Sequence, residues 1–258
     1  MASGKVMMSN NLEILSQEIS AMVAVLVNVA TVLLGSAVGL IFRNKINEKF
    51  TKAVISALAL VTVLIGLKSA LGTADILCVI ICMALGTVIG ELIGIDDGIE
   101  GAGDFIKKKL LKGENTENRF TEGFVTACIV FCVGSMTIMG SFEAGINGNN
   151  SIIYAKSALD FVSGMMFAAA MGLGVPFAAL FVLVFQGALT LLAGVLAPFL
   201  SAAVVSEMSA AGGVILVGMG INMLELSPKR IKVANMLPAV FLPIAYVPLS
   251  DWITAMLA

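Results

Sequence analysis

The sequence contains no histidine, and only 12% of its 258 residues are charged. Without imidazole side chains the chain has no histidine for general acid–base catalysis, for haem ligation or for a zinc site. The 15 Lys and Arg residues nearly balance the 17 Asp and Glu residues, so the basic surface that nucleic-acid binding requires is missing. These absences exclude most hydrolase mechanisms and a nucleic-acid partner, and we expect no cofactor and no metal centre.

Hydrophobic residues dominate instead, at 59% of the chain, with a mean hydropathy of +1.03. Eight membrane helices of roughly 20 residues each would use about 160 positions, which is close to the number of hydrophobic residues present. The composition therefore predicts a membrane protein whose principal partner is the lipid bilayer, with no separate soluble domain.

The four cysteines form two pairs with helical i, i+4 spacing inside apolar runs, Cys78 with Cys82 and Cys128 with Cys132. We interpret them as small apolar packing residues. The alternative is a thiolate metal or redox site, which this spacing supports weakly because no imidazole or carboxylate group accompanies either pair.

The first apolar run, residues 21–42, is too long for a signal-peptide core and lacks the basic start of one, so we expect a retained helix. Glycines and a proline at Gly172, Gly174 and Pro176 divide a later continuous run into two spans. The predicted spans are 21–42, 53–70, 76–95, 121–140, 154–171, 175–200, 208–224 and 233–249. The fold class is thus an all-α polytopic helix bundle of about eight spans, or seven if that division is absent.

Lysine and arginine accumulate in the loops after the first, third and seventh spans, which all fall on one side of the membrane. These residues are Arg43, Lys45, Lys49, Lys52, Lys107, Lys108, Lys109, Lys112, Arg119, Lys229, Arg230 and Lys232. Only Lys5, Lys68 and Lys156 lie near the opposite side. We therefore place the basic loops in the cytoplasm and both termini outside, with residues 1–20 as an extracytoplasmic tail. Residues 96–118 form the longest cytoplasmic loop, and an amphipathic stretch at 105–111 is either a surface helix or a solvated connector.

Self-comparison of the sequence indicates an internal repeat. Residues 31–35 resemble 190–194, residues 63–68 resemble 217–222, and residues 85–88 resemble 237–240, in the same order. A first repeat (21–95) and a second repeat (175–250) would then be joined by linking helices within 119–174. Because the step from span one to span six crosses the membrane an odd number of times, the two copies would have opposite orientations.

Ionisable groups inside a membrane are costly and are candidates for function by default. Asp160 lies in the fifth span, and Lys156 lies four residues earlier on the same helix face, where the two can pair. The pair marks either a transport site or an ion pair that only neutralises itself near the outer interface.

Buried amides are the second group of candidates. Asn28 in the first span and Gln186 in the sixth fall within one residue of each other in the repeat, so they could bind a solute together at the midplane. Hydrogen bonding between helices is the alternative use of such amides. Asn222 and Asn235 lie near the inner ends of the seventh and eighth spans.

Glycines and hydroxyl residues interrupt the fourth span between residues 132 and 141, around Gly134 and Ser135. This run either opens a broken helix that exposes backbone groups to an ion or forms an ordinary helix at a tight crossing. Elsewhere, glycines four residues apart are typical of closely packed membrane helices. They are Gly35 with Gly39, Gly86 with Gly90, and Gly90 with Gly94.

Five ordered motifs resemble the YdfK/YqgA-like bacterial membrane proteins, a domain of unknown function, over residues 28–239. The motifs are Arg119-Phe-Thr-Glu122-Gly123, Phe131-Cys-Val-Gly134-Ser135, Lys156-Ser-Ala-Leu-Asp160, Gln186-Gly187 and Asn235-Met-Leu-Pro238. The resemblance implies a multi-pass protein of the bacterial inner membrane. It implies no reaction or substrate.

The residues favour a small secondary transporter or ion-translocating protein for a cation or small polar solute. An enzyme is disfavoured, because Ser135 lacks a histidine partner and the spans hold a single Asp. A non-transporting structural or regulatory protein is the alternative, and self-association of the chain stays open. The predicted binding residues are Asn28, Ser135, Lys156, Asp160, Gln186, Asn222 and Asn235.

Overall fold

The computed structural model describes residues 2–43, 48–110 and 119–257, which form helices and no strands. The long helices are α1 (Ala2–Arg43), α2 (Glu48–Ala70), α3 (Ile76–Ile93), α7 (Ser151–Met171), α8 (Gly174–Leu196) and α9 (Ala202–Met223). The shorter elements are α4 (Ile95–Leu110), α5 (Phe120–Val133), α6 (Ser135–Asn147), η1 (Ala197–Phe199), η2 (Val233–Val240) and α10 (Pro243–Leu257). The prediction of an all-α bundle is confirmed.

Six of these helices are long and apolar enough to cross a membrane, and two bent pairs raise the number to as many as eight. The pairs are α5 with α6, bent by 53°, and η2 with α10, bent by 47°. The predicted division between the fifth and sixth spans is confirmed, since α7 ends at Met171 and α8 begins at Gly174. Gly172 makes the reversal with φ of 86°, a backbone conformation that side chains with a Cβ rarely adopt.

The boundaries differ from the sequence prediction in three places. Helix α1 already begins at Ala2, so the segment taken as an extracytoplasmic tail is helical, because no proline or glycine pair breaks it. Residues 95–110 form helix α4 where the sequence predicted a loop with a short amphipathic stretch. The eighth span is a 3-10 helix followed by α10, because Pro238 and Pro243 cannot continue a regular α-helix.

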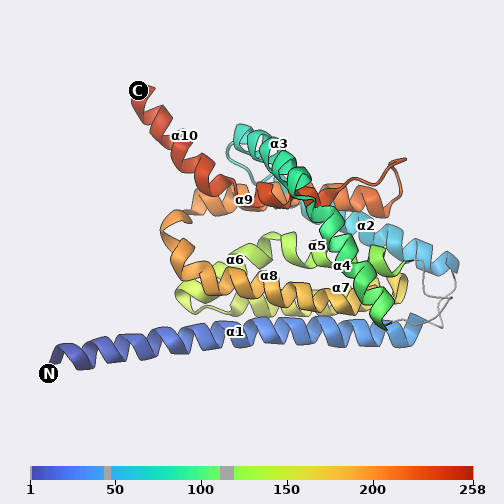
Figure 1. Ribbon diagram of the computed structural model, residues 1–258, viewed down its shortest axis with the longest axis horizontal. Coiled ribbons are helices and arrows are strands. Elements are labelled where there is room, and N and C mark those ends of the chain that lie inside the picture. The colour runs from blue at the N-terminus through green and yellow to red at the C-terminus, as the bar shows by residue number, and fades with distance from the viewer. Residues whose placement is uncertain (1, 44–47, 111–118, 258) are drawn as a thin grey trace.

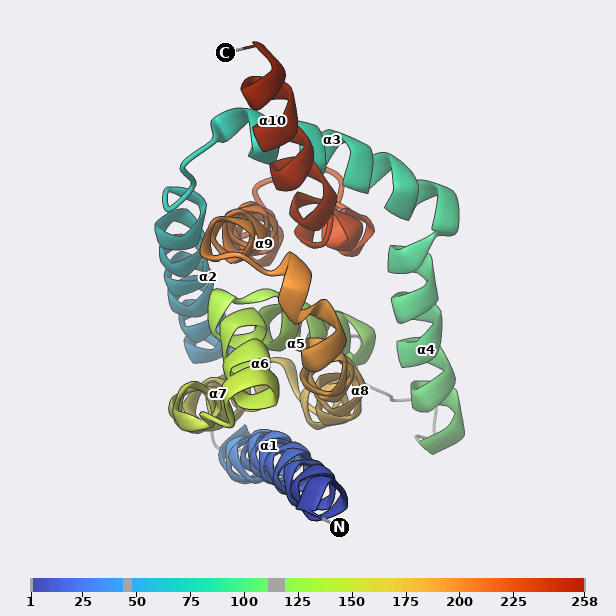
Figure 2. The same cartoon turned by 90° about the vertical axis from the view of Figure 1, so that its left-hand side faces the viewer.

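Helices α1, α7, α8 and α9 run along one common direction, and the start of α1 and the end of α10 lie on the same side of the molecule (Figure 1 and Figure 2). The end of α1, the start of α2, the end of α4 and the segment between α9 and η2 lie at the opposite end, and these elements carry the described parts of the three basic segments. Lys45 and Lys112 fall outside the described residues. Helix α4 runs across the view in Figure 2, in which α1, α7, α8 and α9 are seen nearly end-on. Its orientation fits a helix lying at a membrane surface.

This arrangement makes the orientation testable. In a variant without native cysteines, Lys108→Cys should be protected from an impermeant maleimide in intact cells, because basic segments favour the cytoplasm. Asn149→Cys, in the exposed turn between α6 and α7, is the matched control and should be labelled from outside. Labelling of position 108 before the cells are permeabilised would reverse the assignment.

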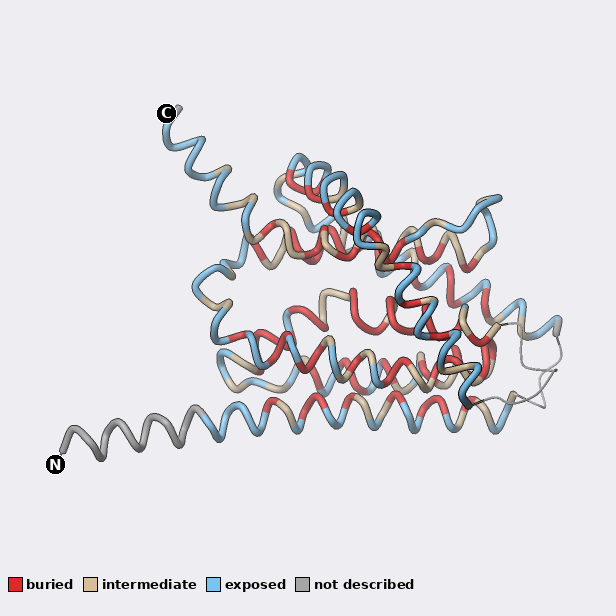
Figure 3. Tube along the Cα trace, in the orientation of Figure 1, coloured by how far each residue is buried: buried red, intermediate tan, exposed pale blue. Residues whose placement is uncertain are grey.

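Burial differs strongly among the helices (Figure 3). In its most apolar stretch, 61% of α9 is buried inside the protein, compared with 28% of α3. Helix α9 is therefore central, whereas α3 presents large apolar side chains such as Leu92, which is 83% exposed, to the surroundings. Lipid is the solvent in which such a surface is stable.

The predicted glycine pairs make close helix contacts at four of their positions. A Cβ atom on Gly35 would lie 2.1 Å from the carbonyl oxygen of Phe161 in α7, and Gly39 contacts Met165 in the same way. Gly90 is equally close to Asn235 in η2, and Gly86 contacts Ala239. Gly94 instead ends α3 in a left-handed conformation, with nothing near its Cβ position.

Candidate functional site

Lys156 and Asp160 form a buried ion pair on α7. Their i, i+4 spacing places both on one face of the helix, and only 5% of Lys156 and 7% of Asp160 are exposed. Because α7 begins at Ser151, Asp160 is the tenth of its 21 residues and lies near the middle of the span. This position is deeper than the sequence predicted.

Asn28 and Gln186 meet next to this pair. The Asn28 Nδ2 group donates a hydrogen bond of 2.8 Å to Gln186 Oε1, and both side chains are completely buried. Each amide lies near the middle of its span, Asn28 in the apolar stretch Leu15–Arg43 of α1 and Gln186 in α8. The two amides that the repeat aligned are therefore direct partners.

Contacts of Asp160 connect the amides to the ion pair. The Asn28 side chain lies close enough to the Asp160 carboxylate to interact with it. Cys132 in α5 lies close enough to interact electrostatically with both Lys156 and Asp160. Four predicted site residues from three helices thus form one group, which we call the midplane cluster: Asn28, Lys156, Asp160 and Gln186.

The midplane cluster contains polar atoms without partners. Asn28 Oδ1 and Gln186 Nε2 are buried and make no hydrogen bond. Leaving such an atom unpaired costs about 1–3 kcal/mol. The two amides consequently offer one free acceptor and one free donor within the cluster.

A broken helix passes this cluster. Gly134 ends α5 and begins α6 with extended backbone angles (φ −63°, ψ 147°), near the middle of the bent span. The Thr137 hydroxyl donates to the Phe131 carbonyl oxygen at 2.9 Å, which satisfies one of the backbone groups that the break releases. Of the two interpretations left open by the sequence, the structure has the broken helix.

The serines of this broken span occupy different positions. Ser135 is half-buried at the start of α6, and no described contact joins it to the midplane cluster. Ser141 is fully buried, and its hydroxyl has no partner. Helices α6 and α8 run in the same direction (Figure 1), and Gly145 of α6 packs on Thr190 of α8. Ser141 lies one helical turn before Gly145, and Gln186 lies one turn before Thr190. Ser141 is therefore at the level of Gln186.

The other two predicted amides serve the chain itself. Asn222 exchanges two hydrogen bonds with the backbone of Ile231, at 2.8 and 2.9 Å, and so closes the loop between α9 and η2. Asn235 accepts a hydrogen bond of 2.7 Å from the Asp96 backbone N–H and donates one to Glu91. The structure does not join either residue to the midplane cluster.

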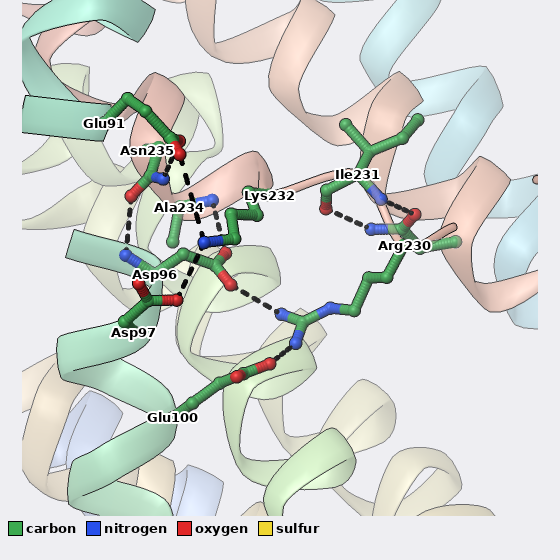
Figure 4. Close-up of polar contacts among 10 residues, drawn as sticks. Glu91, Asp96, Asp97, Glu100, Arg230, Ile231, Lys232, Ala234 and Asn235 are labelled. Carbon is green, nitrogen blue, oxygen red and sulfur yellow. Dashed lines mark hydrogen bonds and ion pairs between the residues drawn. The ribbon is translucent and has the colours of Figure 1, made fainter. Parts of the chain in front are cut away.

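Asn235 belongs to a polar network that the sequence did not reveal (Figure 4). Arg230 pairs with Asp96 and Glu100, and Lys232 pairs with Asp97 and Glu91. Asp96 is almost completely buried and also accepts a hydrogen bond from the Ala234 backbone N–H. The network fixes α4 and the end of α3 against η2.

Charge and hydrogen bonding explain the stability of this network. The hydrogen bond from Lys232 to Asp97 raises the pKa of the exposed Lys232 ammonium group above its ordinary value. Asp96, Asp97 and Glu100 offer carboxylate oxygens within 4.8 Å of one another. Because Arg230 and Lys232 already pair with them, we assign the group a structural role.

The four cysteines are free and buried, as expected for packing residues. The Sγ atoms of Cys78 and Cys82 lie 3.8 Å apart in α3. Glu207 in α9 is a further buried polar residue, and it directly precedes the predicted span 208–224. Its carboxylate accepts hydrogen bonds from the Thr73 hydroxyl and from the Ala74 backbone N–H at 2.8 Å, which holds the turn between α2 and α3.

These features define a class: a multi-pass helical membrane protein with interrupted helices and an ionic cluster buried halfway along its spans. Within that class, residues 23–248 match the family described as "Protein of unknown function (DUF554)", and the chain belongs to this family.

Two relatives extend over nearly the whole chain. The chain is 28% identical to the "Uncharacterized protein YqgA" of Escherichia coli (strain K12), over 90% of this chain and 97% of the relative. It is 24% identical to the "Uncharacterized membrane protein YdfK" of Bacillus subtilis (strain 168), over 84% of this chain and 91% of the relative. No solved structure matches the chain.

Proposed function

We propose that this protein is a small secondary transporter or ion-translocating protein that moves a cation or small polar solute through the midplane cluster. One observation carries the proposal. A buried ion pair and two amides with unpartnered polar atoms lie at the middle of their spans, beside a helix that is interrupted at the same depth. Transporters typically bind their solutes at the bilayer midplane between interrupted helices.

Energetics favour a functional role for these residues. Burying an ion pair costs several kcal/mol per ion, and well-packed apolar residues are often as stabilising. The unpaired atoms of Asn28 and Gln186 add to that cost. A site that repeatedly binds and releases a solute requires such groups, whereas a purely structural core does not.

Packing between the proposed repeats supports an inverted-repeat architecture. Adding 154 to a residue number of α2 gives the aligned residue of α9, so Gly66 corresponds to Gly220. Gly66 packs on Gly213 and Val217, and Gly220 packs on the residues that correspond to these two, Ala59 and Val63. A two-fold axis through the α2–α9 crossing would produce this reciprocal contact.

The directions of the helices support the same architecture. In Figure 1, α1 runs opposite to α8, α2 opposite to α9, and α3 opposite to η2 and α10. The axis relating such pairs would lie in the membrane plane, as in transporters that open alternately to the two sides. For the location we propose the bacterial inner membrane, with the basic segments in the cytoplasm.

The alternative is a non-transporting structural or regulatory membrane protein. It is supported by the closed state of the midplane cluster, in which each of the four residues is less than a tenth exposed. A transporter must open this cluster to each side in turn, whereas a structural protein keeps it closed.

A ligand screen on purified protein tests the proposal. A solute at 100 times its dissociation constant should add about 2.7 kcal/mol of stability to the folded state. Thermal unfolding would be followed with alkali cations, neutral polar solutes, zwitterions and anions. We expect one of these classes of solute to stabilise the wild-type protein. The stabilisation should be lost in Asp160→Asn and kept in Asp251→Asn, the control at an exposed position. Equal stabilisation of both variants would place the binding site elsewhere.

A further inference from the structure

We propose that the solute recognised by the midplane cluster is a small zwitterion that carries an ammonium and a carboxylate group, as a free amino acid does. This inference rests on the proposed function and specifies its substrate class. The solute's carboxylate would bind the Lys156 ammonium, and the solute's ammonium would bind the Asp160 carboxylate. The solute would therefore replace the internal ion pair with two intermolecular ones.

The side-chain charges of the midplane cluster sum to zero. The cluster contains one positive and one negative side chain, which neutralise each other. The neighbouring elements bring no further charge to this depth, because α8 has no ionisable residue, α1 has none between residues 21 and 42, and α2 has none between 53 and 67. The Cys132 thiol is the neighbour from α5. On α6, Glu143 lies two residues after Ser141; its carboxylate accepts a hydrogen bond from Asn147, and no described contact joins it to the midplane cluster.

A cation bound here would leave one uncompensated positive charge, and an anion would leave one negative charge. An unpaired charge in a low-dielectric interior is strongly unfavourable. A zwitterion leaves the site neutral both before and after binding, and no proton has to move. Among charged solutes, it alone satisfies both Lys156 and Asp160.

The unpartnered amide atoms of the cluster also match a zwitterion. Asn28 lies next to the Asp160 carboxylate, and its free Oδ1 is an acceptor for a second N–H of an ammonium group. Gln186 Nε2 is a free donor for a carboxylate oxygen. The site thus offers an acceptor pair, Asp160 with Asn28, and a donor pair, Lys156 with Gln186, which match the two ends of one zwitterion.

The long side chain of Lys156 makes the exchange feasible. Its flexible four-carbon stem lets the ammonium group move away from Asp160 while it stays in the site. Because Asp160 and Lys156 belong to the same rigid helix, the gap that opens between them is small. A short zwitterion such as glycine or alanine therefore fits better than a long one.

Counterflow in proteoliposomes tests the inference, with labelled glycine and labelled L-alanine as probes. We expect wild-type protein to exchange each label for the unlabelled form inside. Excess methylammonium or acetate, which carry one charge each, should reduce the exchange less than twofold. Imposing a membrane potential with potassium and valinomycin should not change the exchange, since the loaded site is neutral.

Variants distinguish a loss of solute binding from a loss of folding. The double variant Lys156→Gln/Asp160→Asn removes both charges and retains near-isosteric side chains, and it should fold while losing exchange by about 100-fold or more. No exchange of either zwitterion by folded wild-type protein would overturn the inference. If an alkali cation or a neutral solute instead gives Asp160-dependent flux, the inference also fails, but the proposed transport function stands. Exchange that persists in the double variant would contradict both.

Discussion

Asp160→Asn should reduce solute flux per folded molecule by about 100-fold. The substitution keeps the shape of the side chain, and the Asn carbonyl oxygen can still accept a hydrogen bond from Lys156. It removes the single carboxylate of the midplane cluster, on which a cationic or ammonium group would bind. Losing one partner of a buried charged contact costs about 2–5 kcal/mol, and 2.7 kcal/mol corresponds to about 100-fold.

The measurement is uptake into proteoliposomes, with protein folding checked by size-exclusion chromatography and thermal unfolding. Asp251→Asn makes the same chemical change at an exposed position of α10 and is the control. A structural ion pair without a transport role predicts that Asp160→Asn loses stability while the flux per folded molecule stays unchanged. If Asp160→Asn folds normally and retains full flux, the carboxylate is not part of the transport site.

Gly35→Ala should destabilise the protein by about 3 kcal/mol or more, at the upper end of what overpacking usually costs. The new Cβ atom would lie 2.1 Å from the Phe161 carbonyl oxygen and 2.9 Å from its carbon. Both are backbone atoms, so no side-chain rotation can relieve the clash, and α1 must separate from α7. That separation would also displace Asn28 from Asp160.

Gly194→Ala is the matched control, because Gly194 is also a helical glycine and nothing lies within 4 Å of its Cβ position. Replacing glycine by alanine in an open helical position favours folding by about 0.5–1 kcal/mol. Denaturant or thermal unfolding in detergent would measure both variants. Equal stability of the two variants would show that α1 and α7 are not in close contact at Gly35.

Much of the fold could be predicted because its signals are local. Apolar runs defined the spans, Gly172 and Gly174 divided α7 from α8, and the weak helix propensity around Gly134 indicated the break in the fourth span. The break between η2 and α10 also has a local signal, because Pro238 and Pro243 fall within one predicted span.

The candidate site could be predicted only in part. Lys156 and Asp160 are four residues apart, so helical spacing alone brought them together, and the repeat aligned Asn28 with Gln186. No sequence pattern joined these two pairs, because that contact depends on the packing of α1 against α7. The network of Arg230 with Asp96 was missed for the same reason, since its members come from segments far apart in the chain.

Access to Cys132 is the most direct measurement of whether the midplane cluster opens. Cys132 is fully buried in α5, close enough to Lys156 and Asp160 to interact with them electrostatically. In a variant with Cys78, Cys82 and Cys128 replaced by alanine, it would be the single thiol that N-ethylmaleimide can modify. A transporter opens the cluster in each cycle, so we predict that Cys132 is labelled in native membranes and that a bound solute slows the labelling. Labelling that occurs only after denaturation would show that the cluster stays closed and would contradict a transport role.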